Sequence, residues 1–254
     1  MTPYERQREI LSILKDGQFK SVHFLAKKLF SSEPTIRRDL TILKKNREVE
    51  RVSGGAIISG DKYRERPIML SNKENHDQKH IIAQLAIKLV KKNHRIFLDS
   101  SSTCFLLAKE MTKFNNLTVV TNGLLTAHLL SEESDSVIHC TGGRVYSNRS
   151  SVNGHYANCF IQGHYADITF ISCKGLDVNF GISDLTEEEA AVKKMYYANS
   201  KETILLVDSS KFNKVYFSKA VDWSQISTII SNEKLPLNLL QKSLDYQIKV
   251  IYPE

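Results

Sequence analysis

The first 58 residues carry a hydrophobic pattern that predicts three short helices followed by a β-hairpin. Apolar side chains recur every three or four positions in the helical segments and alternate with polar ones in the strands. The predicted helices are 5–15, 22–29 and 33–45, and the predicted strands are 48–52 and 56–58. Ser21 and Ser32 stand where a hydroxyl would cap the second and third helices, and Gly54 and Gly55 supply a tight turn. Three helices and a hairpin predict a winged helix-turn-helix.

The pattern changes beyond residues 59–75, a polar stretch that is interpreted as a linker. Short runs rich in β-branched residues then alternate with longer helical stretches. The predicted strands are 95–99, 117–121, 137–140, 167–173, 203–208, 226–231 and 247–251, and the predicted helices are 76–92, 103–111, 123–131, 154–164, 186–200 and 236–242. This alternation is typical of an α/β domain with a largely parallel sheet. The expected organisation is a small domain over residues 1–58 and a larger α/β domain over residues 76–254.

The positive charge of the chain is concentrated in the small predicted domain. The formal net charge is +7; residues 1–58 hold 12 lysines and arginines against 7 acidic residues, whereas the other 196 residues hold 23 against 21. A basic excess on a small domain favours a polyanion such as double-stranded DNA as the partner. An ordinary solvated basic surface would carry the same charge, so both interpretations stay open on charge alone.

The composition argues against several other classes of protein. No apolar run approaches the roughly 18 residues that a membrane span needs, and no apolar segment follows a basic start as in a secretory signal. The cysteines are Cys104, Cys140, Cys159 and Cys173. They form no CxxC pair, which argues against structural zinc and fits a reducing cytoplasm. His76 and His80 lack a third ligand nearby and are interpreted as a solvated helix face. A cytoplasmic protein without metal, cofactor or membrane partner is expected.

The third predicted helix presents a polar face suited to DNA. Its apolar stripe turns inward, so arginine and threonine side chains point outward, where they can meet guanine and the thymine methyl group. The predicted DNA-contacting residues are Ser32, Thr35, Arg37, Arg38, Thr41, Lys45 and, on the hairpin, Arg51. The alternative is an amphipathic helix with an ordinary basic surface.

Polar residues follow successive predicted strands of the second domain. Residues 99–103 read Asp-Ser-Ser-Ser-Thr ahead of a helix, a loop that suits either a bound phosphate or a simple helix cap. Further polar groups follow other strands at 121–122, 142–144, 174–177 and 208–212. Ligands of open α/β sheets bind beyond the carboxyl ends of the strands, so these residues are expected to line one ligand site.

Taken together, these motifs resemble the DeoR family of bacterial transcription regulators. The N-terminal matches are Leu25-Ala26-x-x-Leu29, Ser32-Glu33-Pro34-Thr35-Ile36-Arg37-Arg38-Asp39-Leu40 and Arg51-Val52-Ser53-Gly54-Gly55-Ala56, and the polar loops match the effector domain in the same order. The resemblance covers nearly the whole chain. It implies a larger domain similar to ribose-5-phosphate isomerase and a phosphorylated sugar as effector. The effector-binding residues that it implies are Asp99, Ser100, Ser102, Thr103, Thr121, Asn122, Lys174, Asp177, Glu189 and Lys211.

A few positions depart from the family pattern. Arg47 stands where the family usually has the glycine that ends the recognition helix, and Ser53 where it has a histidine. Ser101 replaces a loop glycine, and Cys173-Lys174 replaces a smaller apolar residue followed by aspartate. These departures concern the wing, the phosphate loop and the selectivity for a sugar.

The function that the resemblance implies is a sequence-specific regulator, usually a repressor of a sugar uptake or catabolism operon that a sugar phosphate releases from DNA. Repeated half-sites call for a homo-oligomer, a dimer or a tetramer. Two alternatives stay open. One is a sugar-phosphate isomerase-like enzyme with a DNA-binding appendage, in which Asp177, Asp184 and Glu188 act with Lys193 or Lys211. The other is an architectural DNA-binding protein without an effector.

Overall fold

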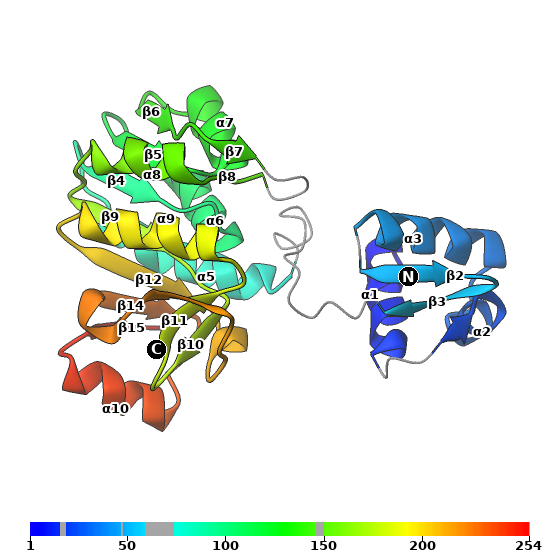
Figure 1. The fold of residues 1–254 in the computed structure, drawn as a ribbon. Coiled ribbons are helices and arrows are strands. Elements are labelled where there is room, and N and C mark those ends of the chain that lie inside the picture. Colours follow the sequence, from blue (N-terminus) through cyan, green and yellow to red (C-terminus); the bar gives the residue numbers. More distant parts are fainter. Residues whose placement is uncertain (16–18, 47, 59–73, 146–149, 254) are drawn as a thin grey trace. The chain divides into compact units, whose positions relative to one another are not determined.

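The computed structural model describes residues 1–15, 19–46, 48–58, 74–145 and 150–253, in two compact units, Met1–Pro67 and Ile68–Glu254 (Figure 1). Of the predicted linker, only Glu74 and Asn75 fall within the described residues, and Arg47 lies outside them. Among the described residues, no helix combines the length and the apolar character that crossing a membrane requires.

The N-terminal unit packs three helices against a small antiparallel sheet (Figure 1). The helices are α1 (Pro3–Leu14), α2 (Val22–Lys28) and α3 (Glu33–Lys45), and the strands are β1 (Lys20–Ser21), β2 (Val49–Val52) and β3 (Gly55–Ile58). The strand order is β1-β3-β2. Each helix buries its apolar stripe, with Ile10, Leu25 and Leu40 fully inaccessible. The predicted winged helix-turn-helix is confirmed.

Two details of this unit differ from the prediction. Helix α1 begins at Pro3, two residues early, because Thr2 and Glu5 form a reciprocal cap: the Thr2 hydroxyl accepts from Glu5 N at 3.2 Å, and Thr2 N donates to the Glu5 carboxylate at 2.7 Å. Strand β1 was not predicted, since two residues are too short to show alternation. Its backbone runs so close to β3 that a Cβ on Gly55 would lie 2.2 Å from the Lys20 carbonyl oxygen. Glycine is therefore required at position 55.

The larger unit is built on a seven-stranded parallel sheet, which confirms the predicted α/β architecture. The strand order is β15-β14-β12-β9-β4-β5-β6. The strands are β4 (Arg95–Leu98), β5 (Thr118–Thr121), β6 (Val137–Cys140), β9 (Ile168–Ile171), β12 (Thr203–Val207), β14 (Thr228–Ser231) and β15 (Lys249–Ile251). The helices are α5 (His76–Ala86), α6 (Ser102–Met111), α7 (Leu124–Glu133), α8 (His155–Gln162), α9 (Glu187–Ala198) and α10 (Leu237–Asp245).

Helices cover both faces of this sheet, so the unit has two apolar cores. One core gathers residues of α5, α6 and α7, and the other gathers residues of α8, α9 and α10. Figure 1 shows α9 in front of the sheet and α5 and α6 behind it. Consecutive strand residues such as Phe97 and Leu98, or Phe170 and Ile171, belong to opposite cores. Strands buried on both faces explain why their sequences run continuously apolar instead of alternating.

Several short elements of this unit were not predicted. The helix expected over 76–92 ends at Ala86 and continues only as a 3-10 turn, Ile87–Leu89. Strands β10 (Gly175–Asp177), β11 (Gly181–Asp184) and β13 (Ser218–Val221) form an antiparallel sheet, and β7 (Arg144–Val145) pairs with β8 (Val152–Asn153). These strands lack the run of β-branched residues that marks parallel strands of similar length such as β5 and β14, so the sequence pattern does not indicate them.

Candidate DNA-binding face and effector site

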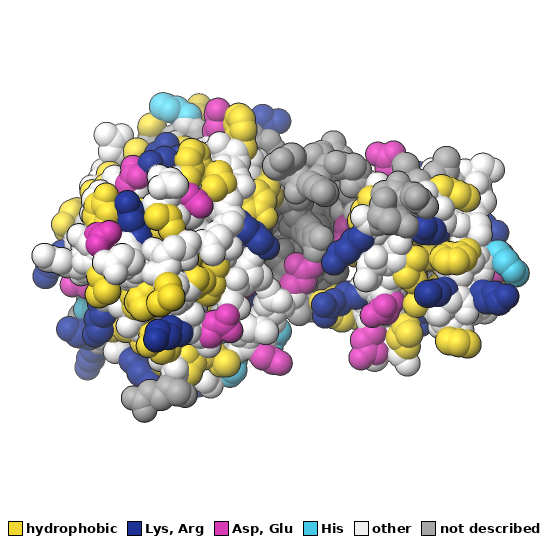
Figure 2. Space-filling model, turned by 90° about the horizontal axis from the view of Figure 1, so that it is seen from below, with side chains coloured by type: hydrophobic (Ala, Val, Ile, Leu, Met, Phe, Trp, Pro, Cys, Tyr) yellow, Lys and Arg dark blue, Asp and Glu magenta, His cyan; other side chains and the backbone are white. Residues whose placement is uncertain are grey.

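The solvent face of α3 carries most of the predicted DNA-contacting residues. Arg37, Arg38, Thr41 and Lys45 are exposed, while the apolar stripe of the same helix is buried. Figure 2 shows this unit from the side opposite α3, and lysine and arginine side chains lie on that side as well. The exposed arginines, threonine and lysine of α3 can neutralise phosphates and reach base edges at the same time.

The start of α3 is fixed by its own cap. The Ser32 hydroxyl accepts from Thr35 N at 3.4 Å, and the two hydroxyl oxygens lie 2.8 Å apart. Pro34 lies in the first turn, where a missing N–H costs little. Both predicted residues thus stand at the N-terminal end of the helix, the end that faces base pairs in a helix-turn-helix.

The hairpin and the recognition helix meet through two predicted residues. Arg51 of β2 donates from Nη1 to Thr41 Oγ1 at 3.4 Å, and the Thr41 hydroxyl donates to the Arg37 carbonyl oxygen at 2.8 Å. Arg37 also pairs with Glu33 at 3.4 Å. Within the described residues, Arg38 has no hydrogen-bond or ion-pair partner, so its guanidinium is available to a ligand.

Asp39 lies in the same motif, but its side chain is buried in the interior of the N-terminal unit. It is 2% exposed, Arg6 Nε donates to its Oδ2 at 2.5 Å, and Gln7 Nε2 donates to its Oδ1 at 3.0 Å. Sequence analysis assigned it no role, although an acidic residue on the inward side of a helix is a sign of a buried ion pair.

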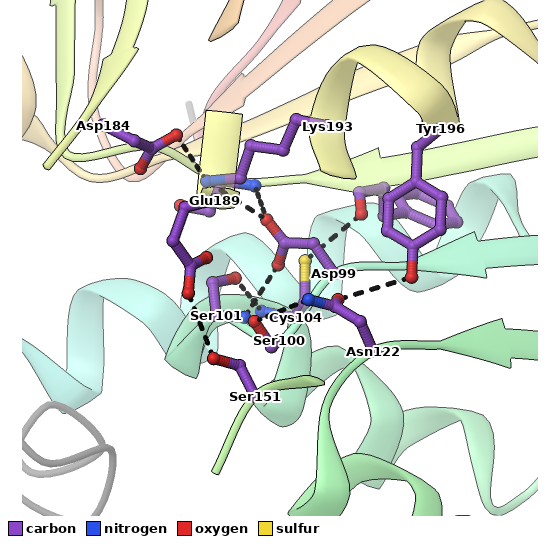
Figure 3. A network of polar contacts seen from close by, with 12 residues as sticks. Asp99, Ser100, Ser101, Cys104, Asn122, Ser151, Asp184, Glu189, Lys193 and Tyr196 are labelled. Carbon is purple, nitrogen blue, oxygen red and sulfur yellow. Dashed lines mark hydrogen bonds and ion pairs between the residues drawn. The ribbon is translucent and has the colours of Figure 1, made fainter. Parts of the chain in front are cut away.

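In the larger unit, polar side chains converge beyond the carboxyl ends of β4, β5 and β9 (Figure 3). Asp99 follows β4, and its two carboxylate oxygens accept from Ser101 N and from Ser172 N, each at 2.8 Å. The loop before α6 is therefore tied to the end of the neighbouring strand. Ser102 and Thr103 form the first turn of α6 and are buried.

Ser101, which replaces the family's usual glycine, caps this helix. Its hydroxyl accepts from Cys104 N at 3.2 Å, and its backbone is extended, with φ −69° and ψ 156°. Any residue adopts that conformation, so the replacement adds no backbone strain. The free N–H groups of the α6 N-terminus remain suited to an anion.

Asn122 joins three elements of the site (Figure 3). Its Nδ2 donates to Ser100 Oγ at 3.4 Å and to Asn153 Oδ1 at 3.1 Å, and its Oδ1 accepts from the Tyr196 hydroxyl at 3.3 Å. The preceding Thr121 is fully buried, and its hydroxyl accepts from Gly123 N at 3.0 Å. Both predicted residues thus lie in the polar cluster.

Glu189 extends this cluster from the first turn of α9. One of its oxygens, Oε1, accepts from Ser151 Oγ and from Asn153 Nδ2, each at 3.0 Å. Ser151 and Asn153 were missed in the sequence, since they lie in or beside the two-residue strand β8 and follow no helical or strand pattern. The Tyr196 ring stacks on Phe97 at 5.0 Å between centroids, and its hydroxyl belongs to the polar cluster.

A buried ion pair closes the cluster. Lys193 Nζ lies 2.6 Å from Asp184 Oδ2 and 3.8 Å from Asp99 Oδ2, and all three side chains are nearly inaccessible (Figure 3). Burial lowers the pKa of Lys193, but the carboxylates of Asp184 and Asp99 outweigh it, and the pKa ends above its ordinary value. Lys193 therefore stays protonated, and its single positive charge offsets part of the negative charge of the two buried acids.

A second group of charges lies beyond the ends of β9 and β12. Burial and the nearby Lys174 lower the pKa of Lys211. Burial likewise lowers the pKa of Lys79, on α5, from 10.5 to about 8; Asp208 opposes this shift, and Lys211 and Lys174 add to it. Asp208 belongs to the polar loop 208–212 that was expected at the ligand site, whereas Lys79 was not among the predicted residues. Desolvated cations gathered around a single aspartate suit an anionic ligand.

Asp177 stands apart from these residues. Its Oδ1 accepts from Asn179 N and Phe180 N, both at 2.9 Å, and so closes the turn between β10 and β11. No hydrogen bond or ion pair found in the described residues joins its carboxylate to the rest of the predicted effector set.

Cys104 has the character of a packing residue. It is fully buried, burial raises the pKa of its thiol well above the ordinary value, and Sγ donates to the Phe170 carbonyl oxygen at 3.5 Å. A protonated buried thiol is a poor nucleophile. Over the residues that the structure describes, no three histidine, cysteine or acidic side chains are grouped so that they could hold a metal ion.

Comparison with known proteins assigns both units to one family. The model of the DeoR-like helix-turn-helix domain matches residues 6–61, and the model of the DeoR C-terminal sensor domain matches residues 74–233. The two matches together span most of the chain.

Curated relatives are similar over nearly their full length. The chain is 31% identical to the HTH-type transcriptional regulator GolR of Listeria innocua, covering 98% of both chains. It is 32% identical to the L-fucose operon activator of Haemophilus influenzae, covering 97% of this chain and 98% of that one. It is 31% identical to the lactose phosphotransferase system repressor of Streptococcus mutans, covering 91% and 93%. Among solved structures, ribose 5-phosphate isomerase A of Methanocaldococcus jannaschii matches 55% of each chain, with a TM-score of 0.41 and 20% identity.

Proposed function

The chain belongs to the DeoR family of transcriptional regulators, and from this we propose that it binds operator DNA sequence-specifically and releases it when a phosphorylated sugar occupies the larger unit. One observation carries the proposal. The same chain combines an exposed basic recognition helix with polar side chains converging at one edge of a parallel sheet. Such a regulator acts beside the chromosome, in the cytoplasm.

The DNA-contacting surface is the exposed side of α3 together with the hairpin. We assign base reading to Arg38, whose guanidinium has no partner among the described residues, and assign phosphate contacts or further base contacts to the rest of the predicted set. These are Ser32, Thr35, Arg37, Thr41, Lys45 and Arg51. A dimer or tetramer would place such helices on repeated half-sites.

The effector site uses two kinds of group. The start of α6, with Ser100, Ser102 and Thr103, offers N–H and hydroxyl donors to a phosphate. Lys174 and Lys211 add positive charge, while Asn122 and Glu189 are suited to sugar hydroxyls. Asp177 is left out, because its carboxylate already closes a turn.

The site supports binding rather than catalysis. Two residues of the enzyme hypothesis, Lys193 and Asp184, are held together in a buried ion pair, and Lys193 stays protonated, so this pair offers no free base. The three curated relatives named above are regulators. One is named an activator and another a repressor, and we propose repression for this chain, as the family resemblance implies.

The test is a mobility shift of the gene's upstream DNA at fixed salt, with sugar phosphates added one at a time and random DNA as control. The expected result is a specific shift that one sugar phosphate releases. A protein that prefers no sequence is not an operator-binding regulator. Turnover of pentose or hexose phosphates would favour the isomerase-like enzyme instead.

A further inference from the structure

The first described residues of the larger unit, Glu74 and Asn75, are both held by groups of that unit. Lys79 Nζ donates to the Glu74 carbonyl oxygen at 2.7 Å. Asn75 Nδ2 donates to Asp208 Oδ1 at 3.2 Å and to Ser210 Oγ at 3.1 Å. The two Asn75 contacts bridge 133 and 135 residues of sequence, so they are tertiary contacts and not part of a local turn.

Asn75 gives up its usual local role to make these contacts. It is the N-cap residue of α5, where an asparagine side chain normally accepts from the first turn of its own helix, but it makes no capping hydrogen bond. Its backbone is left-handed, with φ 51° and ψ 37°. Asparagine tolerates this conformation better than most residues. The Asn75 side chain thus donates to Asp208 and Ser210 instead of capping its own helix.

Within the described residues, only one of the two carboxylate oxygens of Asp208 has hydrogen-bond partners. Its Oδ1 accepts from Asn75 Nδ2, from Ser210 N at 3.1 Å and from the Ser210 hydroxyl. Its Oδ2 is buried and has no hydrogen-bond partner within the part of the chain that the structure describes. A buried acceptor without a donor is unfavourable, so Asp208 Oδ2 would gain from a donor that reaches it.

Asp208 also connects Asn75 to the proposed effector site. It caps the 3-10 turn Ser209–Lys211, which carries Lys211. Its charge acts on both Lys79 and Lys211. A ligand that engages Lys211 therefore acts on the same turn whose atoms hold Asn75.

We propose that Asn75, Asp208 and Ser210 form a latch, which couples ligand binding at Lys211 to residues 59–73, the segment leading to the DNA-binding unit. The inference rests on the proposed function, because it requires a ligand at Lys211. Such a ligand shifts the equilibrium only by binding the open latch more tightly than the closed one, and the open latch lowers operator affinity.

The test compares two latch variants with a matched control in the full chain. Asn75→Gly removes the amide and keeps the left-handed backbone accessible, and Ser210→Ala removes one acceptor. The control is Asn238→Ala. Asn238 is likewise an asparagine of the larger unit whose Nδ2 donates to another side chain, Asn213 Oδ1, at 2.8 Å. The probes are ribose 5-phosphate, fructose 1-phosphate, fructose 6-phosphate and galactose 6-phosphate. Calorimetry gives the probe Kd without DNA, and mobility shifts give the factor by which saturating probe weakens operator binding.

In both latch variants the open state is favoured before any probe binds, so we expect operator affinity without probe to fall toward that of the probe-saturated wild type. The probe should bind at least as tightly as to the wild type, and the weakening factor should fall by about tenfold or more, within the usual range of coupling between sites. The control should behave like the wild type. If the wild type binds the probe and releases the operator, but the weakening factor is unchanged in both variants, the latch is overturned and the proposed function stands. A loss of probe affinity that accounts for the lost release also overturns it, since Asn75 would then belong to the binding site. If no probe binds the wild type, the proposed function fails and the latch with it.

Discussion

Arg6 of α1 donates from Nε to the buried carboxylate of Asp39 in α3 at 2.5 Å. The pair joins the first helix of the N-terminal unit to the helix that carries the proposed DNA-reading residues. Asp39 occupies the inward side of α3 while its neighbours Arg37 and Arg38 occupy the outward side. One short motif therefore supplies both the support of the recognition helix and its reading surface.

Replacing Arg6 and replacing Asp39 are expected to lower the free energy of unfolding of the N-terminal unit by different amounts. Arg6→Met leaves the Asp39 charge buried with only Gln7 as donor, and should lower the free energy of unfolding of the N-terminal unit by about 3 kcal/mol. Asp39→Asn leaves the Arg6 guanidinium without its carboxylate, but the Arg6 side chain is 12% exposed against 3% for Asp39 and can extend toward water, so this change should cost less. Denaturant unfolding of the full chain, followed by a probe in the N-terminal unit, measures both. Equal losses would show that the buried charge is not what sets the cost. The exposed pair Glu33 and Arg37 is the control; Glu33→Gln should cost under about 1 kcal/mol.

Arg38→Ala should weaken operator binding in a sequence-dependent way. If the guanidinium reads a guanine, its loss costs about 1–3 kcal/mol of preference for the operator over random DNA. Fluorescence anisotropy on both DNAs at fixed salt measures this difference. Arg8→Ala, a change to an exposed arginine of α1, should leave the preference intact. Equal weakening on both DNAs would make Arg38 a phosphate contact, with a reduced salt slope as its sign.

The main architecture was predictable because long elements carry strong patterns. Helix α3 was predicted with the bounds that the structure has, since Ser32, Pro34 and a three-position apolar stripe all agree. The parallel strands were predicted because their sequences hold runs of β-branched residues. The sheet of β10, β11 and β13 was not predicted, because its strands hold no such run and are defined by their neighbours in space.

The candidate site divides in a similar way. Residues in loops directly after long strands, such as Asp99 and Asn122, were found because the end of a strand is visible in the sequence. Ser151 and Asn153 were missed because their role depends on contacts with Glu189, distant in sequence. Lys79 was missed for the same reason: only the fold shows that this residue of α5 lies in the electrostatic neighbourhood of Asp208, at the end of β12.

Effector binding is expected to weaken as the pH rises through about 8. The pKa of Lys79 is lowered from 10.5 to about 8 by burial, with Lys211 and Lys174 lowering it further and Asp208 and Glu74 opposing. An anion bound beside these lysines favours the charged form and raises that pKa, so binding takes up a proton. Affinity should therefore be constant well below pH 8 and fall above it, where the phosphate itself no longer titrates. Calorimetry near pH 8 in two buffers of different ionisation enthalpy measures the proton uptake. Equal heats in both buffers, with pH-independent affinity, would contradict the prediction.

Lys211→Met should weaken the response to a sugar phosphate by about tenfold or more while leaving operator affinity unchanged. Lys211 is largely buried, and its pKa is lowered by burial and by Lys174, so its charge is costly until an anion neutralises it. Removing the charge takes away the reason for the anion to bind, whereas nothing on α3 changes. The measurement is the concentration of sugar phosphate that half-releases the operator, which should rise about tenfold or more, the equivalent of at least 1.4 kcal/mol. Lys201→Met, a change to an exposed lysine of the same unit, is the control and should respond like the wild type. A normal response from Lys211→Met would remove Lys211 from the site and leave the N-terminus of α6 as the phosphate contact.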